Sequence, residues 1–461
     1  MTRTLALMLA LAPLIAAAPA AAQDVPARYT PRPFVQVKHP EWSKNATIYQ
    51  LNTRQFTREG TFAAATRELP RIKALGADII WLMPIHPIGE KNRKGTLGSP
   101  YAVRDYRAVN PEFGDMADFK QFVDAAHKLG MKVILDWVAN HSAWDNALVR
   151  EHPDWYVRDW KGDFMPTPWF DWSDIIDFDY SKPGLRQYMT EAMAFWVREA
   201  GVDGFRCDVA GAVPVDFWEN ARAELDAIKP VFMLAEAEDT ALHARAFDAS
   251  YGWSWANTMR AIGEGHGDVG GLYGFYSANS SMWPHDAMRL MMTENHDFNS
   301  WDGTAFERLR EAQTNAIVLS VVGAGIPMIY NGQEAGNQKR LEFFERDPIM
   351  WRDHPNAALF RRLFALKHAN RALWNADWGG AMVRVVNSQP ARVFSFTREK
   401  DGDKVFAALN FSGEPQTVSF TDGPFAGDYV DFDGGAKVTL AANATMTLQP
   451  WSYRVLVKGG R

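Results

Sequence analysis

The stretch GFRCDVA (residues 204–210) places Arg206 and Asp208 two positions apart inside an otherwise apolar run. Alternate side chains of a β-strand point to the same side, so the two charged groups share one face. Burying a charge costs free energy unless the charge is paired or put to use. Taken alone, the pair is typical of a structural ion pair, and the rest of the chain decides whether it is more.

Length and charge limit the classes of protein to consider. A chain of 461 residues, 47% of them apolar, fits one large α/β barrel with an accessory module. The net charge of -6, with no long basic run, argues against a nucleic-acid partner and gives no reason for membrane-surface binding. Beyond the N-terminus no apolar run is long enough to span a membrane, so we expect no membrane anchor. The oligomeric state stays open.

Residues 1–22 have the features of a secretory signal peptide. One Arg precedes a short apolar run, and AAA (residues 20–22) supplies the small residues of a site cleaved after Ala22. We therefore expect export to the periplasm or the extracellular medium. Cys207 is the single cysteine, so the exported protein cannot form an internal disulfide.

From about residue 45 to 372, short apolar runs alternate with amphipathic helical stretches such as Asp118–Leu129 and Gly184–Ala200. We interpret the following runs as strands: Thr47–Asn52, Asp78–Pro84, Lys132–Val138, Gly204–Asp208, Val231–Glu236, Phe247–Tyr251, Leu290–Thr293 and Pro327–Tyr330. Alternating strands and helices in this number predict a parallel (β/α)8 TIM barrel in a catalytic domain of residues 23–375.

Two regions depart from this alternation. The connection after the third strand, residues 141–181, is long and rich in Trp, Pro and Asp. Loops of that length are usually functional, so we expect a small loop subdomain, with most of its tryptophans buried. Residues 376–461 consist of short alternating runs separated by turns, among them Asp401-Gly402, which is typical of a hairpin. They predict a C-terminal antiparallel β-sandwich domain.

Polar side chains gather at the carboxyl ends of the predicted strands, where barrels of this kind place their chemistry. The strand-end residues are Asp136, Asn140 and His141, then Arg206 and Asp208, then Glu236, and finally His296 and Asp297. We interpret Asp136 as structural, supporting Arg206 from the neighbouring strand. The other three carboxylates come from three different strands and are candidates for acid–base chemistry.

Four segments in order resemble the four signature regions of the α-amylase family of glycoside hydrolases. They are DWVANH (136–141), GFRCDVA (204–210), FMLAEAE (232–238) and TENHD (293–297). The segment GSPYAVRDYRAVNPEFG (98–114) resembles the family's tyrosine-bearing loop after strand two, and FDASYGW (247–253) resembles its strand-six region. The likeness runs from about Lys44 to the C-terminus. It implies a glycosidase of the retaining type on this barrel.

Retaining glycosidases need two carboxyl groups about 5 Å apart, on opposite sides of the glycosidic bond. Asp208 is the natural nucleophile, and we expect Arg206 on the same face to lower its pKa. Glu236 is the acid/base, whose pKa would be raised by partial burial and by the Asp208 carboxylate. Glu238 shares the Glu236 face and competes for this role, but it lies beyond the expected strand end.

The resemblance implies roles for the remaining site residues. It makes Asp297 the group that stabilises the transition state by gripping sugar hydroxyls. It makes His141 and His296 hydroxyl-binding groups, and Tyr101 a stacking platform under the reacting sugar. From strand position alone, His141 is equally well explained as a structural residue.

The chain departs from the family's pattern next to the nucleophile. Many members have Lys-His at the positions of Gly211 and Ala212, so the acceptor side of the site must be built differently here. The expected chemistry requires no cofactor and no catalytic metal. A structural calcium is allowed but not implied, with oxygen ligands from Asn140, from the Ala212 carbonyl, and from Asp171 or Asp174.

These observations predict hydrolysis of α-1,4-glucosidic bonds in starch-like glucans or maltooligosaccharides, with retention through a covalent glycosyl-Asp208 intermediate. Ser99 takes the place of an Asp found in family members that trim chain ends, which favours an open cleft. Alternatives on the same fold are an α-glucan transglycosylase, an exo-acting α-glucosidase and an α-1,6-acting, neopullulanase-like enzyme. The last stays open because Val209 holds a position linked to linkage preference. An inactive carbohydrate-binding scaffold is less favoured, because all three carboxylates remain.

Overall fold

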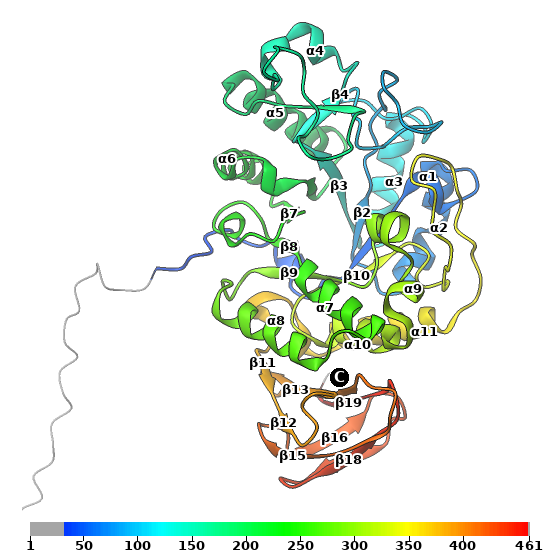
Figure 1. Ribbon diagram of the computed structural model, residues 1–461, viewed down its shortest axis with the longest axis vertical. Coiled ribbons are helices and arrows are strands. Elements are labelled where there is room, and N and C mark those ends of the chain that lie inside the picture. The colour runs from blue at the N-terminus through cyan, green and yellow to red at the C-terminus, as the bar shows by residue number, and fades with distance from the viewer. Residues whose placement is uncertain (1–31, 460–461) are drawn as a thin grey trace, which may run out of the picture. The chain divides into compact units, whose positions relative to one another are not determined.

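The computed structural model describes residues 32–459, and within them a set of parallel strands closes into a barrel (Figure 1). The barrel strands are β1 (Ile48–Leu51), β2 (Ile79–Leu82), β3 (Lys132–Val138), β6 (Gly204–Asp208), β7 (Phe232–Ala235), β8 (Ala249–Tyr251), β9 (Met288–Met292) and β10 (Ile326–Tyr330). Their order around the barrel is β1-β10-β9-β8-β7-β6-β3-β2. Each overlaps a predicted strand, so the predicted (β/α)8 barrel is confirmed.

Barrel strands are covered on both faces, which explains why they read as continuous apolar runs. Every residue of β6 is buried, as is every residue of β7 and β9. Side chains facing the surrounding helices and side chains facing the barrel axis are therefore both withdrawn from water. A charged residue in such a strand must find its partner inside the barrel.

Helices surround the barrel and connect its strands. They are α1 (Thr53–Phe56), α2 (Phe62–Ala74), α3 (Met116–Lys128), α4 (Ala147–Glu151), α5 (Pro183–Glu199), α6 (Val215–Asp226), α7 (Trp253–Glu264), α8 (Val269–Ser281), α9 (Ala305–Leu309), α10 (Gln313–Val322) and α11 (Pro355–Ala369). The sequence of α3 explains why this segment is helical. Asp115 and Asp118 form a capping box at its start, and Phe119, Phe122 and Val123 are buried along one face.

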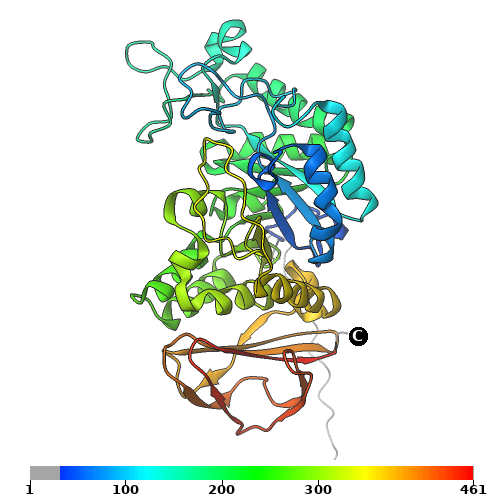
Figure 2. The same cartoon turned by 90° about the vertical axis from the view of Figure 1, so that its right-hand side faces the viewer.

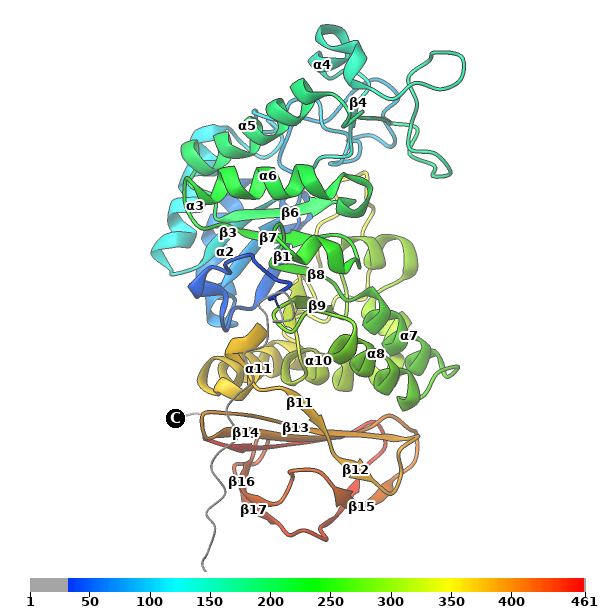
Figure 3. The same cartoon turned by 90° about the vertical axis from the view of Figure 1, so that its left-hand side faces the viewer.

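The connection between β3 and α5 forms its own small structure. β4 (His141–Ala143) pairs antiparallel with β5 (Ile175–Asp177), and the segment between them extends beyond the barrel as teal-to-green loops (Figures 2 and 3). The prediction that most of its tryptophans are buried is wrong. Trp160 is 88% exposed and Trp169 is fully exposed, because these side chains lie on the projecting loops rather than in a local core.

Two antiparallel sheets follow α11. They are built from β11 (Met382–Arg384), β12 (Val386–Asn387), β13 (Val393–Lys400), β14 (Asp403–Asn410), β15 (Gln416–Asp422), β16 (Gly427–Asp431), β17 (Lys437–Leu440), β18 (Thr445–Leu448) and β19 (Tyr453–Lys458). The sheet orders are β11-β13-β14-β19-β16-β17 and β12-β15-β18, and a cluster including Phe406 and Phe420 is buried between them. α8 and α10 lie against β13 and β14 (Figure 3).

The hairpin predicted at Asp401-Gly402 is confirmed. Lys400 pairs with Asp403 across the turn, and both turn residues have positive φ, 52° for Asp401 and 89° for Gly402. Such a two-residue turn matches the right-handed twist of the strands that it joins. The predicted signal peptide, residues 1–22, lies outside the described residues. Within residues 32–459, no helix is both long and apolar enough to cross a membrane.

Candidate active site

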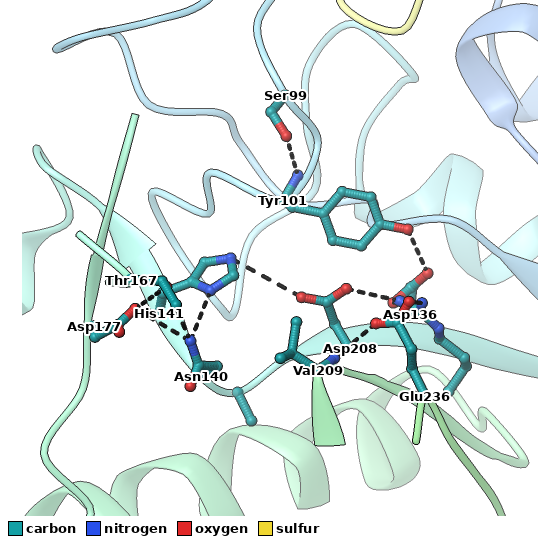
Figure 4. Close-up of polar contacts among 12 residues, drawn as sticks. Ser99, Tyr101, Asp136, Asn140, His141, Thr167, Asp177, Asp208, Val209 and Glu236 are labelled. Atoms are coloured by element: carbon teal, nitrogen blue, oxygen red, sulfur yellow. Dashed lines mark hydrogen bonds and ion pairs between the residues drawn. The ribbon is translucent and has the colours of Figure 1, made fainter. Parts of the chain in front are cut away.

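Asp136, Asp208 and Glu236 lie close together at the carboxyl ends of β3, β6 and β7 (Figure 4). All three contact the guanidinium of Arg206. Its Nη1 donates to Asp136 Oδ1 at 2.8 Å and to Asp208 Oδ1 at 2.9 Å. Its Nη2 forms an ion pair with Glu236 Oε1 at 2.8 Å. Arg206 therefore supports Asp208, as expected, and the structure adds Glu236 as a third carboxylate on the same cation.

Glu236 is the first residue after β7, and its position is fixed from two sides. Its main-chain N–H donates to the Cys207 carbonyl at 3.0 Å, and its Oε2 accepts the N–H of Val209 at 2.8 Å. Val209 has φ 44° and ψ 41°, a left-handed conformation that is a genuine outlier for a β-branched residue. The strained turn directly after Asp208 thus aims a hydrogen-bond donor at Glu236.

Glu238, the competing carboxylate, has different partners. It forms an ion pair with Arg289 and accepts hydrogen bonds from the Ser254 hydroxyl and main chain. Because Glu236 instead contacts Arg206 beside Asp208, only Glu236 of the two lies in the carboxylate cluster. This geometry agrees with the choice of Glu236 over Glu238.

Asp297 and His296 follow β9 and reach the cluster through Tyr101. His296 Nε2 lies 3.3 Å from Asp297 Oδ2 and 2.7 Å from the Tyr101 hydroxyl, which donates to Asp136 Oδ2 at 3.0 Å. The rings of Tyr101 and His296 are stacked, with centroids 5.5 Å apart. The side chain of Asp297 is 41% exposed, so it faces the open mouth of the site.

His141 lies on the other side of Asp208, with Nε2 4.0 Å from Asp208 Oδ2 (Figure 4). The Asn140 amide contacts its Nδ1 at 3.2 Å. Burial lowers the pKa of His141 to about 3, and burial together with the charge of Arg206 lowers that of His296 to about 3. Both imidazoles are therefore neutral near pH 7.

The Tyr101 hydroxyl donates to Asp136, so the N–H on His296 Nε2 donates to Tyr101. The Gln50 amide lies 2.8 Å from His296 Nδ1. The N–H on His141 Nε2 is the one left for a sugar hydroxyl group.

Burial controls the protonation of the cluster. Burial and the Glu236 charge raise the pKa of Asp208 well above its ordinary value, and they outweigh Arg206, which lowers this pKa as expected. Arg206 does favour the ionised form, but it is shared with Asp136 and Glu236. Burial also raises the pKa of Asp136 to about 6. Burial and the neighbouring carboxylate charge therefore favour the protonated form of Asp208 in the free protein.

Several residues of the site were not predicted from the sequence. Trp81 Nε1 donates to Asp136 Oδ2 at 3.1 Å, and Arg206 Nε donates to the Tyr251 hydroxyl at 3.2 Å. Trp81 and Tyr251 belong to barrel strands. A side chain with a polar atom that faces the barrel axis is the feature by which the sequence could have indicated them. Phe343 lies parallel to Tyr101, with centroids 6.2 Å apart. It comes from the loop after β10, and no pattern in that loop indicates its place.

The residues proposed for a calcium site do not fit an ion well. Lys94 Nζ lies 3.4 Å from Asp171 Oδ1 and 4.0 Å from Asp174 Oδ1, so a side-chain ammonium already neutralises these carboxylates. The Asn140 amide nitrogen donates to Asp177 at 3.1 Å. Across the described chain, no group of three or more His, Cys, Asp or Glu side chains is arranged to hold a metal.

Comparisons with known proteins agree with this fold and site. Residues 31–241 match the family model described as "Alpha amylase, catalytic domain". The chain is 33% identical to a maltogenic α-amylase from Thermotoga neapolitana, with a TM-score of 0.83 over 91% of this chain and 99% of that one. It is 30% identical to the α-amylase MalA of Haloarcula japonica over 87% of this chain, and 31% identical to an α-1,4-glucan:maltose-1-phosphate maltosyltransferase of Pseudomonas aeruginosa over 65%.

An eight-stranded barrel with a cluster of carboxyl groups at the carboxyl ends of its strands is an arrangement suited to glycosidic-bond chemistry. The chain belongs to the α-amylase family of glycoside hydrolases. It spans 61% of the length of the Haloarcula amylase and 48% of the length of the Pseudomonas transferase.

Proposed function

We propose that the protein hydrolyses α-1,4-glucosidic bonds of starch-like glucans or maltooligosaccharides, with retention of anomeric configuration. One observation carries the proposal. A single buried guanidinium, Arg206, contacts Asp208 and Glu236 at 2.9 and 2.8 Å and holds the two carboxyl groups at one mouth of the barrel. Two carboxyl groups placed together at the mouth of the barrel are what a retaining glycosidase requires.

In the proposed reaction, an Asp208 oxygen attacks the anomeric carbon while the bond to the leaving oxygen breaks and Glu236 gives that oxygen its proton. Asp208 must be ionised to attack and Glu236 must carry the proton, so the reaction begins from the form of the carboxyl pair in which Asp208 has given up its proton and Glu236 holds one. A water molecule then gives a proton to Glu236 and attacks the anomeric carbon of the glycosyl-Asp208 ester, which frees Asp208 and the sugar in its original configuration. Every bond change is assigned to these two side chains, so the proposed chemistry calls for no cofactor.

The other residues would bind the sugar in the reacting position. Asp297, half-exposed at the mouth, would accept hydrogen bonds from sugar hydroxyls. The neutral imidazole of His141 would donate one hydrogen bond to a sugar hydroxyl group, and His296 would position Tyr101 beside it. Tyr101 would offer its ring as a stacking surface, held in place by its hydroxyl bonds to Asp136 and His296.

The test compares the parent protein with Asp208→Asn and Glu236→Gln on soluble starch and maltoheptaose. Loss of acid/base catalysis in Glu236→Gln is expected to lower kcat by about 10²–10⁴-fold, and Asp208→Asn is expected to lower it at least as far. Glu238→Gln is the matched control, because it removes the neighbouring carboxylate that contacts Arg289 instead. Undiminished turnover in either cluster variant would refute the assignment.

A second candidate is transfer of the glycosyl group to a sugar acceptor. It is favoured by the small, exposed residues Gly211 and Ala212, which leave the backbone beside Asp208 uncovered. The similarity to a maltosyltransferase supports it further. Products longer than seven glucose units from maltoheptaose would establish transfer. Release of sugars from pullulan would instead test action on α-1,6 bonds, and chain-end release of single units would indicate an exo-acting α-glucosidase.

We also propose that the protein is exported. Residues 1–22 carry the composition of a signal peptide, as described above. N-terminal sequencing of the protein recovered outside the cytoplasm tests this, with Gln23 as the expected first residue. A recovered chain that still begins at Met1 would contradict it.

A further inference from the structure

Three aromatic side chains lead away from the candidate active site along the segment between β4 and β5. The Trp172 ring lies 6.0 Å from the His141 ring, centroid to centroid. Phe170 stacks on Trp172 with centroids 4.4 Å apart and an angle of 19° between the rings. Phe170 is 59% exposed, and Trp169, its neighbour in the sequence, is fully exposed. We call Trp169, Phe170 and Trp172 the aromatic track.

The base of this track is held firmly to the rest of the protein. Trp172 packs against a buried cluster that includes Ile88 and Ile175. Lys94 donates to the main-chain carbonyl of Asp171, and Thr167 donates to Asp177 on β5. The exposed rings therefore stand on an anchored segment, so holding them ready for a ligand costs little further conformational entropy.

Trp169 combines two unfavourable features. Its φ of 69° lies in the left-handed region, which is costly for a bulky residue. Its side chain is also fully exposed, although a tryptophan buries more apolar surface than any other residue when it is covered. Strain and exposure together at one aromatic residue are typical of a binding surface.

We propose that the aromatic track binds the part of the α-glucan chain that extends beyond the reacting sugar. The proposal rests on the function proposed above and adds a preference for long chains. Pyranose rings present apolar C–H faces, which stack on exposed aromatic rings. The continuity of the track with His141, which lies 4.0 Å from Asp208, places the occupant in line with the catalytic cluster.

The charges around the track favour a neutral ligand. Asp171 is exposed, and its carboxylate is balanced by Lys94 at 3.4 Å. Anionic lipid surfaces are recognised by clusters of basic residues, and the segment 165–174 contains none. A neutral glucan therefore fits this surface better than a membrane does.

The test uses the double variant Trp169→Ala/Phe170→Ala. Two substrates are compared, maltoheptaose and a short chromogenic maltoside that does not reach the track. We expect kcat/KM for maltoheptaose to fall about tenfold, since each lost stacking contact weakens binding several-fold, while kcat/KM for the maltoside stays unchanged. Trp160→Ala is the matched control: Trp160 is 88% exposed on the neighbouring turn, with its ring 4.9 Å from the Lys161 ammonium.

Each other outcome overturns a different claim. If the double variant keeps parental kcat/KM on maltoheptaose, or loses it equally on both substrates, the track does not bind extended glucan. If Trp160→Ala has the same effect as the double variant, general aromatic exposure and not the track is responsible. If the parent cleaves neither substrate, the proposed function fails, and calorimetric titration with maltoheptaose then decides about the track by itself. Titration heat that the double variant lacks supports the track, and equal heat, or none, refutes it.

A separate measurement tests whether the aromatic track binds a membrane surface instead. The parent and the double variant are sedimented with vesicles of phosphatidylethanolamine and phosphatidylglycerol. We expect no sedimentation of either protein. Sedimentation of the parent that the double variant loses, with unchanged kinetics on maltoheptaose, would replace the glucan with a lipid surface.

Discussion

The main-chain N–H of Val209 donates a 2.8 Å hydrogen bond to Oε2 of Glu236, so the residue after Asp208 helps to hold the neighbouring carboxyl group. Val209 itself has a left-handed backbone, with φ 44° and ψ 41°. Residues with a Cβ resist this conformation, and glycine does not. The strain is therefore located beside the two carboxyl groups to which we assign the chemistry.

This relationship predicts an unusual order of stability at position 209. Glycine adopts the left-handed region freely, so Val209→Gly is expected to have a larger free energy of unfolding than Val209→Ala, by about 1 kcal/mol. Alanine is ordinarily the more stabilising of the two residues. Urea denaturation of both variants measures the difference. An alanine variant more stable than the glycine variant would show that position 209 is not strained.

Removing Arg206 is expected to destabilise the protein in a pH-dependent manner. Arg206→Met leaves Asp136, Asp208 and Glu236 without their cation, at a cost of about 3–5 kcal/mol in the free energy of unfolding. The loss is larger at pH 8 than at pH 5, because carboxyls with raised pKa values are forced to ionise as the pH rises. Denaturation at both pH values measures this.

Arg67→Met serves as the control for Arg206→Met. Arg67 pairs with Glu59 at 2.7 Å, and both side chains are more than half exposed. Exposed pairs contribute about 0–1 kcal/mol, so this variant should change little at either pH. An Arg206 variant that behaves like the Arg67 variant would contradict the central role of Arg206.

We expect Glu294 to make the stability of the folded protein depend on pH as well. Burial raises its pKa from 4.5 to about 7, although it accepts a 2.7 Å hydrogen bond from Asn299. Its folded state therefore holds the proton more tightly than the unfolded chain does, and stability falls as the pH rises from about 4.5 to 7. Glu294→Gln should therefore raise the free energy of unfolding by up to about 3 kcal/mol at pH 8 and change it little at pH 4.

The partly exposed Glu264 provides the comparison for Glu294. Its pKa is lowered by the hydrogen bond from Arg260, so its contribution has the opposite sign. Glu264→Gln should not raise stability at pH 8. Equal pH profiles for the parent and Glu294→Gln would show that Glu294 does not hold a proton in the folded protein.

Tyr101→Phe is expected to lower kcat/KM as well as the free energy of unfolding. The hydroxyl contacts Asp136 Oδ2 at 3.0 Å and His296 Nε2 at 2.7 Å, and its loss leaves both groups short of a partner, at about 1–3 kcal/mol. We expect kcat/KM on maltoheptaose to fall by at least tenfold. Tyr429→Phe removes a comparable 2.8 Å hydrogen bond to the Phe425 carbonyl in the C-terminal sheets and should leave kcat/KM unchanged.

The strands were predictable because their burial is uniform. β3 and β6 begin and end at the predicted residues, and both are mainly apolar with their charged residues at alternate positions. The support of Arg206 by Asp136 was predictable as well, because neighbouring parallel strands pair Asp136 directly with Arg206. Period-two alternation and strand neighbourhood were sufficient for both conclusions.

Properties that depend on three-dimensional detail were not predictable in this way. The place of Phe343 over Tyr101 depends on a long loop without periodicity. The raised pKa of Asp208 depends on how much water the walls exclude and on Arg206 being shared among three carboxyls. The exposure of Trp169 depends on a left-handed turn at a residue that rarely adopts one.

The most direct test of the central claim is to trap the covalent intermediate. The protein is incubated with a fluorinated maltosyl fluoride that forms the glycosyl ester but is hydrolysed slowly, and its peptides are then weighed by mass spectrometry. We expect one added fluorinated maltosyl group, on the peptide that contains Asp208, and none in Asp208→Asn. A label on Glu236 or Asp297, or none in a protein that cleaves maltoheptaose, would contradict it.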